Sequence, residues 1–180
     1  MRTTMIAFML LAGCMLLFAG PRLNPDPENL PNLQEPRYLI LTAGQPTETG
    51  FREIASMGVK TVINVLPERE CWTGEATVVQ ANNMTYVALP FETTGFKMET
   101  IRKFAALLEN QEKPILVHCS TGNHVGGLWF AYRVLIEKAP LATGLKEGRS
   151  IGLTRALEDS IINWVMDERD NLRAAENVGS

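Results

Sequence analysis

The stretch Ile115-Leu116-Val117-His118-Cys119-Ser120-Thr121-Gly122-Asn123-His124-Val125 decides the fold of this chain. Its apolar start predicts a buried strand, and the polar residues that follow predict a loop that leads into a helix from about Val125. A strand, a loop with glycine and a helix, in this order, gather backbone N–H groups at the positive end of a helix dipole. Such a loop binds an oxyanion, and the same field favours the thiolate form of Cys119.

The anion is expected to lie against the backbone of the residues that follow the thiol. Glycine in this stretch permits the main chain to approach an anion closely. The predicted anion-binding residues are Ser120, Thr121, Gly122, Asn123, His124 and Val125.

Strands that alternate with helices surround this loop and predict an α/β domain over residues 37–170. Its central sheet should be mostly parallel and flanked by helices, with the chemistry on loops after the carboxyl ends of the strands. Residues 171–180 are expected to form a tail. Expected strands cover 38–42, 59–65, 85–89 and 114–118, and expected helices cover 47–58, 75–82, 99–108, 125–137, 141–151 and 154–167.

The first 20 residues differ from the rest, because Arg2 is followed by an unbroken apolar run from Met5 to Gly20. A basic start with such a run indicates a signal peptide or a membrane anchor. Leu11-Ala12-Gly13-Cys14 resembles a bacterial lipobox, which makes Cys14 a candidate for lipidation. Lipidation, cleavage near Gly20 and an uncleaved anchor remain three alternatives, and each places the domain in the periplasm or cell envelope.

Five prolines between residues 21 and 36 predict an extended tether between the membrane and the domain. The net charge of −3 argues against a nucleic-acid partner. Two isolated histidines are too few for a metal site, and no sequence feature indicates a cofactor. Cys71, after the expected strand at 59–65, is either an unpaired loop thiol or a redox partner of Cys119.

The loop resembles the signature of the cysteine-phosphatase superfamily, which includes the tyrosine and dual-specificity phosphatases: His-Cys, five residues, then Arg. It is most similar to a bacterial branch with a shorter loop, His-Cys-x-Ser-Gly-Asn-Arg, described as phosphatase-like, β-lactamase-hydrolase-like or sulfurtransferase-like. The similarity extends to Thr42–Thr47, Gly58–Asn64, Gly127–Arg133 and Glu147–Leu153. It implies a cysteine-phosphatase-like fold, Cys119 as nucleophile, His118 as a residue that orders the loop, and a phosphate ester or other oxyanion as substrate.

This chain departs from that pattern where the family has its loop arginine, because His124 stands there. An arginine grips two oxygens of the anion with a permanent charge, whereas histidine is charged only below about pH 7. The resemblance also implies a carboxylic acid on the loop after residues 85–89, where Glu92 is the candidate; it is otherwise a solvated loop residue.

Three functions therefore remain open at this stage. The first is a weak cysteine-dependent phosphohydrolase that uses Cys119, Glu92 and His124. The second is a pseudoenzyme that binds an anion or a protein without turnover, which the missing arginine favours. The third is a rhodanese-type sulfurtransferase with a persulfide on Cys119, which the six-residue loop from Cys119 to His124 favours.

Overall fold

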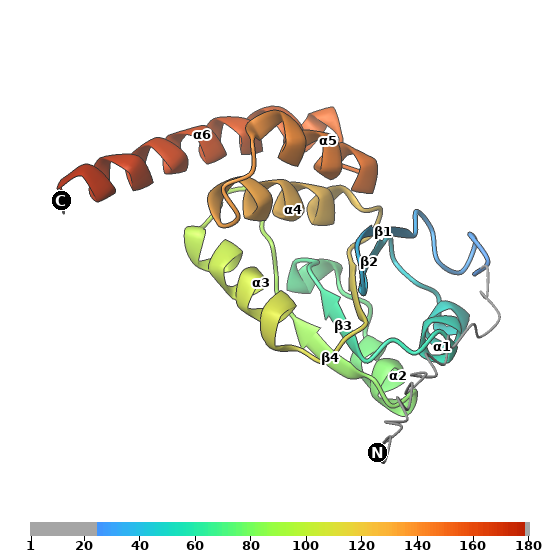
Figure 1. Ribbon diagram of the computed structural model, residues 1–180. Coiled ribbons are helices and arrows are strands. Elements are labelled where there is room, and N and C mark those ends of the chain that lie inside the picture. Colours follow the sequence, from blue (N-terminus) through green and yellow to red (C-terminus); the bar gives the residue numbers. More distant parts are fainter. Residues whose placement is uncertain (1–24, 179–180) are drawn as a thin grey trace, which may run out of the picture.

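The structure, a computed structural model, describes residues 25–178 (Figure 1). The expected signal segment at residues 1–20, with Cys14, lies outside the described residues. Within residues 25–178, no helix combines the length and the apolar character that crossing a membrane requires.

A five-stranded sheet forms the centre of the domain, in the order β1-β2-β5-β3-β4. The pairs β2–β5, β5–β3 and β3–β4 are parallel, and only β1 pairs antiparallel, with β2. The expectation of a mostly parallel α/β sheet flanked by helices is therefore confirmed. The strands are β1 Gln34–Arg37, β2 Ile40–Ala43, β3 Thr61–Asn64, β4 Thr85–Ala88 and β5 Ile115–His118.

Helices cover both faces of this sheet, as Figure 1 shows. Alternate strand residues serve the two sides: Val62 and Leu116 pack with α1 and α2, while Ile63 and Val117 pack with α3, α4, α5 and α6. Helix α4 is buried along almost its whole length, because other helices surround it. The helices are α1 Glu48–Ser56, α2 Glu75–Ala81, α3 Met98–Asn110, α4 Asn123–Leu135, α5 Leu141–Ile151 and α6 Arg155–Val178, with a 3₁₀ turn, η1, at Glu68–Glu70.

The described part of the expected tether differs from an extended, free segment. Leu30 is buried in the core on the α1 side of the sheet. The carbonyl of Pro31 accepts a hydrogen bond from Gly44 N–H at 2.8 Å, and residues 34–37 form the edge strand β1. Although proline and polar residues dominate this stretch, the buried side chain of Leu30 and the backbone hydrogen bonds hold it against the sheet. The C-terminal end differs too, because α6 continues to Val178 instead of ending near residue 167.

A buried carboxylate joins the carboxyl ends of the central strands to α2. Glu75, in the first turn of α2, is 1% exposed. Its Oε1 accepts a hydrogen bond from Asn64 Nδ2 at 2.8 Å and lies 3.1 Å from His118 Nε2, while Oε2 accepts from Gln45 Nε2 at 2.7 Å. A carboxylate has no proton to give, so His118 Nε2 is the donor.

Burial and hydrogen bonding act on Glu75 in opposite directions. Burial raises the pKa of its carboxyl, but the contacts with His118, Gln45 and Asn64 lower that pKa by more, so the net shift is downward. Glu75 is therefore ionised at neutral pH, and its negative charge is compensated by donors from β3, β5 and the loop after β2.

We predict that Glu75→Gln lowers the free energy of unfolding by about 1–3 kcal/mol, because one of the three donors then faces an amide N–H₂ group. Urea denaturation followed by circular dichroism measures the loss. The matched control is Glu48→Gln, since Glu48 is an exposed glutamate in an ion pair with Arg52; we expect it to change stability by less than about 0.5 kcal/mol. Equal losses in the two variants would show that the buried cluster contributes nothing special.

Candidate functional site

Cys119 lies at the point where β5 ends and the loop to α4 begins. Its side chain is fully buried, and its Sγ accepts a hydrogen bond from Gly122 N–H at 3.1 Å. The loop therefore curls around the sulfur, and a main-chain donor stabilises negative charge on it.

The N-terminus of α4 supplies the remaining main-chain donors of the loop. The first hydrogen bond of this helix runs from Gly126 N–H to Gly122 O at 2.7 Å, so the N–H groups of Asn123, His124 and Val125 precede the helical ladder. These are predicted anion-binding residues, and they lie at the positive end of the dipole of α4. Ser120 and Thr121 complete the loop between Cys119 and Gly122.

Two side chains and a carbonyl from distant segments fix the shape of this loop. Gly122 has φ +95°, and a Cβ atom there would collide with Ile151 O and with Asn32 Nδ2, the latter at 2.6 Å. Asn32 Nδ2 donates to Ile151 O and to Thr121 O. Asn123 Oδ1 accepts from the N–H and the hydroxyl of Thr154 at 2.8 and 3.1 Å, which ties the loop to the start of α6. The side chain of Asn123 is thus structural, and only its main chain is left for an anion.

His118 is buried directly before the nucleophile position. Its Nε2 contacts Glu75, and its Nδ1 has no hydrogen-bond partner within the described residues. The sequence predicts that this residue orders the loop. The side chain of His118 contacts Glu75 and not the loop itself. Any effect of His118 on the loop therefore acts through the position of the end of β5.

His124, which stands where the resemblance leads us to expect an arginine, lies half-buried in the first turn of α4. Burial lowers the pKa of its imidazole; the charges of Glu70 and Glu92 raise that pKa by less, and the charge of Arg69 lowers it further. The imidazole is therefore neutral at pH 7. Its Nδ1 is buried and has no protein partner in the described part of the chain.

Glu92, the candidate general acid, lies on the exposed loop after β4 and is bound to an arginine. Both carboxylate oxygens accept a hydrogen bond from Arg69 Nη1 at 3.1 Å. Arg69 belongs to the 3₁₀ turn after β3 and also pairs with Glu70 at 3.3 Å. Because the charges of all three side chains act on His124, they form a charged group beside the loop.

Cys71 is a free thiol, as is Cys119. Its sulfur contacts the carbonyls of Leu66 and Pro67 at 3.7 and 3.5 Å. Burial, followed by the charges of Glu75, Glu68 and Glu70, raises the pKa of the Cys71 thiol. At neutral pH this thiol is therefore mostly protonated, which does not favour the redox alternative.

Two residues that sequence reasoning missed belong to this site. Glu75 gave no signal, because a glutamate at the start of a short helix is ordinary in any sequence. Arg69 lies in the run Glu68-Arg69-Glu70, in the loop after a buried strand. Because loops at the carboxyl ends of parallel strands carry the functional residues, this position could have indicated a role for Arg69. Among the described residues, no cluster of three metal-ligating side chains occurs.

Several solved structures share this fold. A protein assigned as a phosphatase (DUF442) from Shewanella putrefaciens is 23% identical, with a TM-score of 0.62 over 78% of this chain and 92% of that one. A protein assigned as a phosphatase from Neisseria meningitidis is 20% identical, with a TM-score of 0.64 over 73% and 97%. The core catalytic domain of the PP-IP phosphatase Siw14 from S. cerevisiae, in complex with citrate, is 18% identical, with a TM-score of 0.62 over 81% and 93%.

Sequence comparison places the chain in a family directly. Among curated proteins, none matches this chain. The family model described as a DSP-PTPase phosphatase fused to NAD+ kinase matches residues 26–144, which is well over half of the chain. This range includes the edge strand β1, the whole sheet and the loop with Cys119. The chain therefore belongs to this family of DSP-PTPase phosphatases and has the cysteine-phosphatase fold.

Proposed function

We propose that this protein is a cysteine-dependent phosphohydrolase that acts on phosphate monoesters. The observation that carries the proposal is the hydrogen bond from Gly122 N–H to Cys119 Sγ, at the base of a loop whose next N–H groups are free of the helical ladder. A thiolate surrounded by main-chain donors is suited to attack phosphorus while the donors hold the equatorial oxygens.

The reaction then proceeds in two steps. The thiolate of Cys119 forms a bond to phosphorus, and the ester oxygen leaves with its bonding electrons and takes a proton from the carboxylic acid of Glu92. In the second step, water attacks the phosphocysteine, Glu92 accepts the proton of that water, and the thiolate of Cys119 leaves as phosphate is released.

His124 does not replace the charge of an arginine in this scheme. Burial lowers the pKa of the imidazole, so at pH 7 it offers one neutral N–H instead of a cation. Removal of one well-placed charged donor costs on the order of 3 kcal/mol of transition-state stabilisation. The loop alone therefore supports only weak turnover.

Arg69 is the cation that can restore part of this stabilisation. Its pair with Glu92 is exposed at both ends, with side-chain exposures of 65% and 45%, and such a pair contributes only about 0–1 kcal/mol. A phosphate dianion beside the loop competes readily for the guanidinium, which forms two parallel hydrogen bonds to phosphate oxygens. Transfer of Arg69 from Glu92 to the substrate also frees the carboxyl that must donate a proton.

Anion binding without turnover is the second candidate, and the neutral His124 favours it. The solved structures with this fold include Siw14 with citrate and a cysteine-to-serine variant of the P. aeruginosa protein TpbA with phosphotyrosine. A phosphate ester or another oxyanion is accordingly the ligand class that we assign to the loop in either case.

We further propose that residues 1–20 export the domain and hold it at the membrane of the cell envelope, with lipidation of Cys14 as the means of attachment. The support is the apolar run after Arg2 and the lipobox-like Leu11-Ala12-Gly13-Cys14.

We predict that the full-length protein releases p-nitrophenol from p-nitrophenyl phosphate and that Cys119→Ser abolishes this release. In parallel, formation of thiocyanate from thiosulfate and cyanide tests for sulfur transfer. Tungstate binding tests whether the loop binds an oxyanion. We expect hydrolysis and no thiocyanate. Tungstate binding without hydrolysis would favour the anion-binding function, and thiocyanate formation that depends on Cys119 would establish the sulfurtransferase instead.

A double-mutant cycle tests the source of positive charge. We expect His124→Arg to raise kcat/KM about tenfold or more, which corresponds to about 1.4 kcal/mol. Arg69→Gln should lower it about tenfold in the native protein but less than about threefold in the His124→Arg background, because a loop arginine makes Arg69 dispensable. The matched control is Arg52→Gln, since Arg52 is also exposed and paired with a glutamate. Equal losses from Arg69→Gln in both backgrounds would contradict the exchange.

We predict that Cys14→Ser prevents incorporation of labelled palmitate when the full-length chain is produced in a bacterial host. A fusion of residues 1–36 to a reporter that is active only after export measures delivery separately. Unchanged labelling in Cys14→Ser would exclude lipidation, and an inactive reporter would exclude export.

A further inference from the structure

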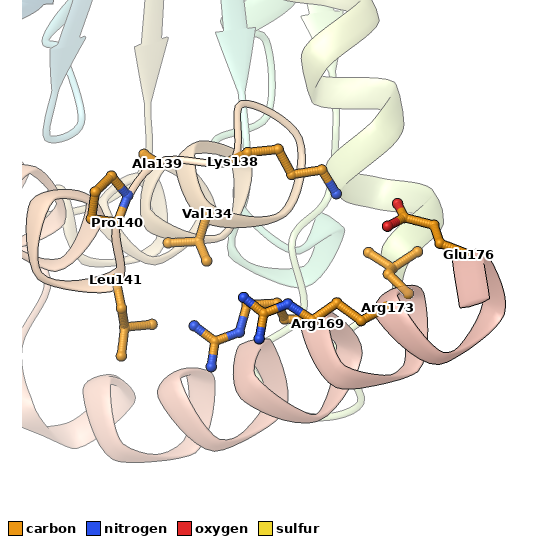
Figure 2. A pocket seen from close by; sticks show the side chains of 9 residues that line it. Val134, Lys138, Ala139, Pro140, Leu141, Arg169, Arg173 and Glu176 are labelled. Atoms are coloured by element: carbon orange, nitrogen blue, oxygen red, sulfur yellow. The ribbon is translucent and has the colours of Figure 1, made fainter.

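A cavity lies between the α4–α5 connection and the last turns of α6 (Figure 2). Its volume is about 410 Å³, which is within the range of pockets for small molecules. It lies beside the carboxyl end of α4, whereas Cys119 precedes the amino end; a helix of this length separates the two by roughly 20 Å.

Three cations and one carboxylate line this cavity: Lys138, Arg169, Arg173 and Glu176. Figure 2 shows the two arginine side chains reaching from α6 into the same space. Each arginine has its nearest carboxylate oxygen on Asp170, at 3.8 and 3.9 Å, which is longer than a hydrogen bond. Within residues 25–178, Nε of Arg169 is buried without any hydrogen-bond partner. A buried guanidinium N–H without an acceptor is costly, and a bound oxyanion would satisfy it.

A helix terminus adds to this positive field. Helix α5 begins at Leu141, and both Leu141 and the preceding Pro140 line the cavity. Pro140 provides no side-chain cap, so the first N–H groups of α5 have no side-chain acceptor from the N-cap residue. The positive end of this helix dipole therefore faces the same space as the two arginines.

The walls of the cavity are ordered and partly apolar. Residues 169, 172, 173 and 176 share one face of α6, because they are three or four positions apart. The connection opposite is fixed by a hydrogen bond from Ala139 N–H to Arg133 O at 2.9 Å, and Lys138 has φ +59°. Val134, Leu141 and Leu172 supply apolar surface next to the charges.

We propose that this cavity, which we call the α6 pocket, binds a small organic phosphate at a site separate from Cys119. Three cations line the pocket, against Glu176 in the lining and Asp170 at 3.8 and 3.9 Å from the two arginines, so a positive charge remains for a phosphate dianion. The guanidinium groups of Arg169 and Arg173 bind its oxygens in pairs. The organic part of the ligand lies against Leu141 and Leu172.

Calorimetry with hexyl phosphate on the full-length Cys119→Ser protein, which cannot hydrolyse the ligand through Cys119, tests the proposal. We expect saturable binding, of which one ligand per chain depends on Arg169 and Arg173. Arg169→Gln and Arg173→Gln should each raise Kd about tenfold or more, or about 1.4 kcal/mol. Arg155→Gln is the matched control, because Arg155 is an exposed arginine on the same helix that does not line the cavity. Hexanol and inorganic phosphate should both bind more weakly than hexyl phosphate.

Chemical modification locates the ligand without relying on the variants. Phenylglyoxal modifies arginine, and peptide mass spectrometry follows each site separately. Hexyl phosphate should slow the modification of Arg169 and Arg173 and leave that of Arg52 and Arg155 unchanged. The proposal is overturned by absence of saturable binding, by equal losses in Arg155→Gln and the two pocket variants, or by protection that misses Arg169 and Arg173. Equal affinity for inorganic phosphate would overturn the assignment of an organic ligand.

Discussion

The buried carboxylate of Glu75 is the constraint on which the rest of the site depends. An ionised carboxyl inside a protein is stable only when donors surround it. Here the donors come from β3, β5 and the loop after β2, so satisfying one charge fixes three segments relative to α2. Strand β5 ends at His118, which contacts Glu75, and the next residue is Cys119. The position of Cys119 therefore depends on the hydrogen bonds that the Glu75 carboxylate requires at the ends of β3 and β5.

The loop after Cys119 combines main-chain donors with a neutral side chain at its end. The main-chain donors, the positive φ of Gly122 and the hydrogen bond to the sulfur are all present. At the position where an arginine was expected, a neutral imidazole lies beside the charged side chains of Arg69, Glu70 and Glu92. In the proposed mechanism, anion binding depends on the backbone of the loop, and transition-state stabilisation requires a charge from outside the loop.

The sequence predicted the features that depend on local pattern. The parallel strands, the nucleophile loop and the apolar helix after it follow from runs of apolar residues and from glycine. Long-range partnerships were not predictable in the same way. Leu30 is one apolar residue among prolines and asparagines, and nothing nearby indicates that it reaches the core. The contacts of Glu75 and the pair between Arg69 and Glu92 join residues 11 to 43 positions apart, at spacings that carry no periodic signal.

Gly122 is held in place by residues outside the motif from His118 to His124. Asn32 and the carbonyl of Ile151 close on the loop from positions about 90 residues before it and 30 residues after it. The seven letters from His118 to His124 are therefore an incomplete description of the site. Transplanted into another protein, they would lose the two neighbours that hold the backbone in its anion-binding curve. A domain that begins at residue 37 would keep all seven residues of the motif and lose Asn32, one of the two residues that hold the loop in its shape.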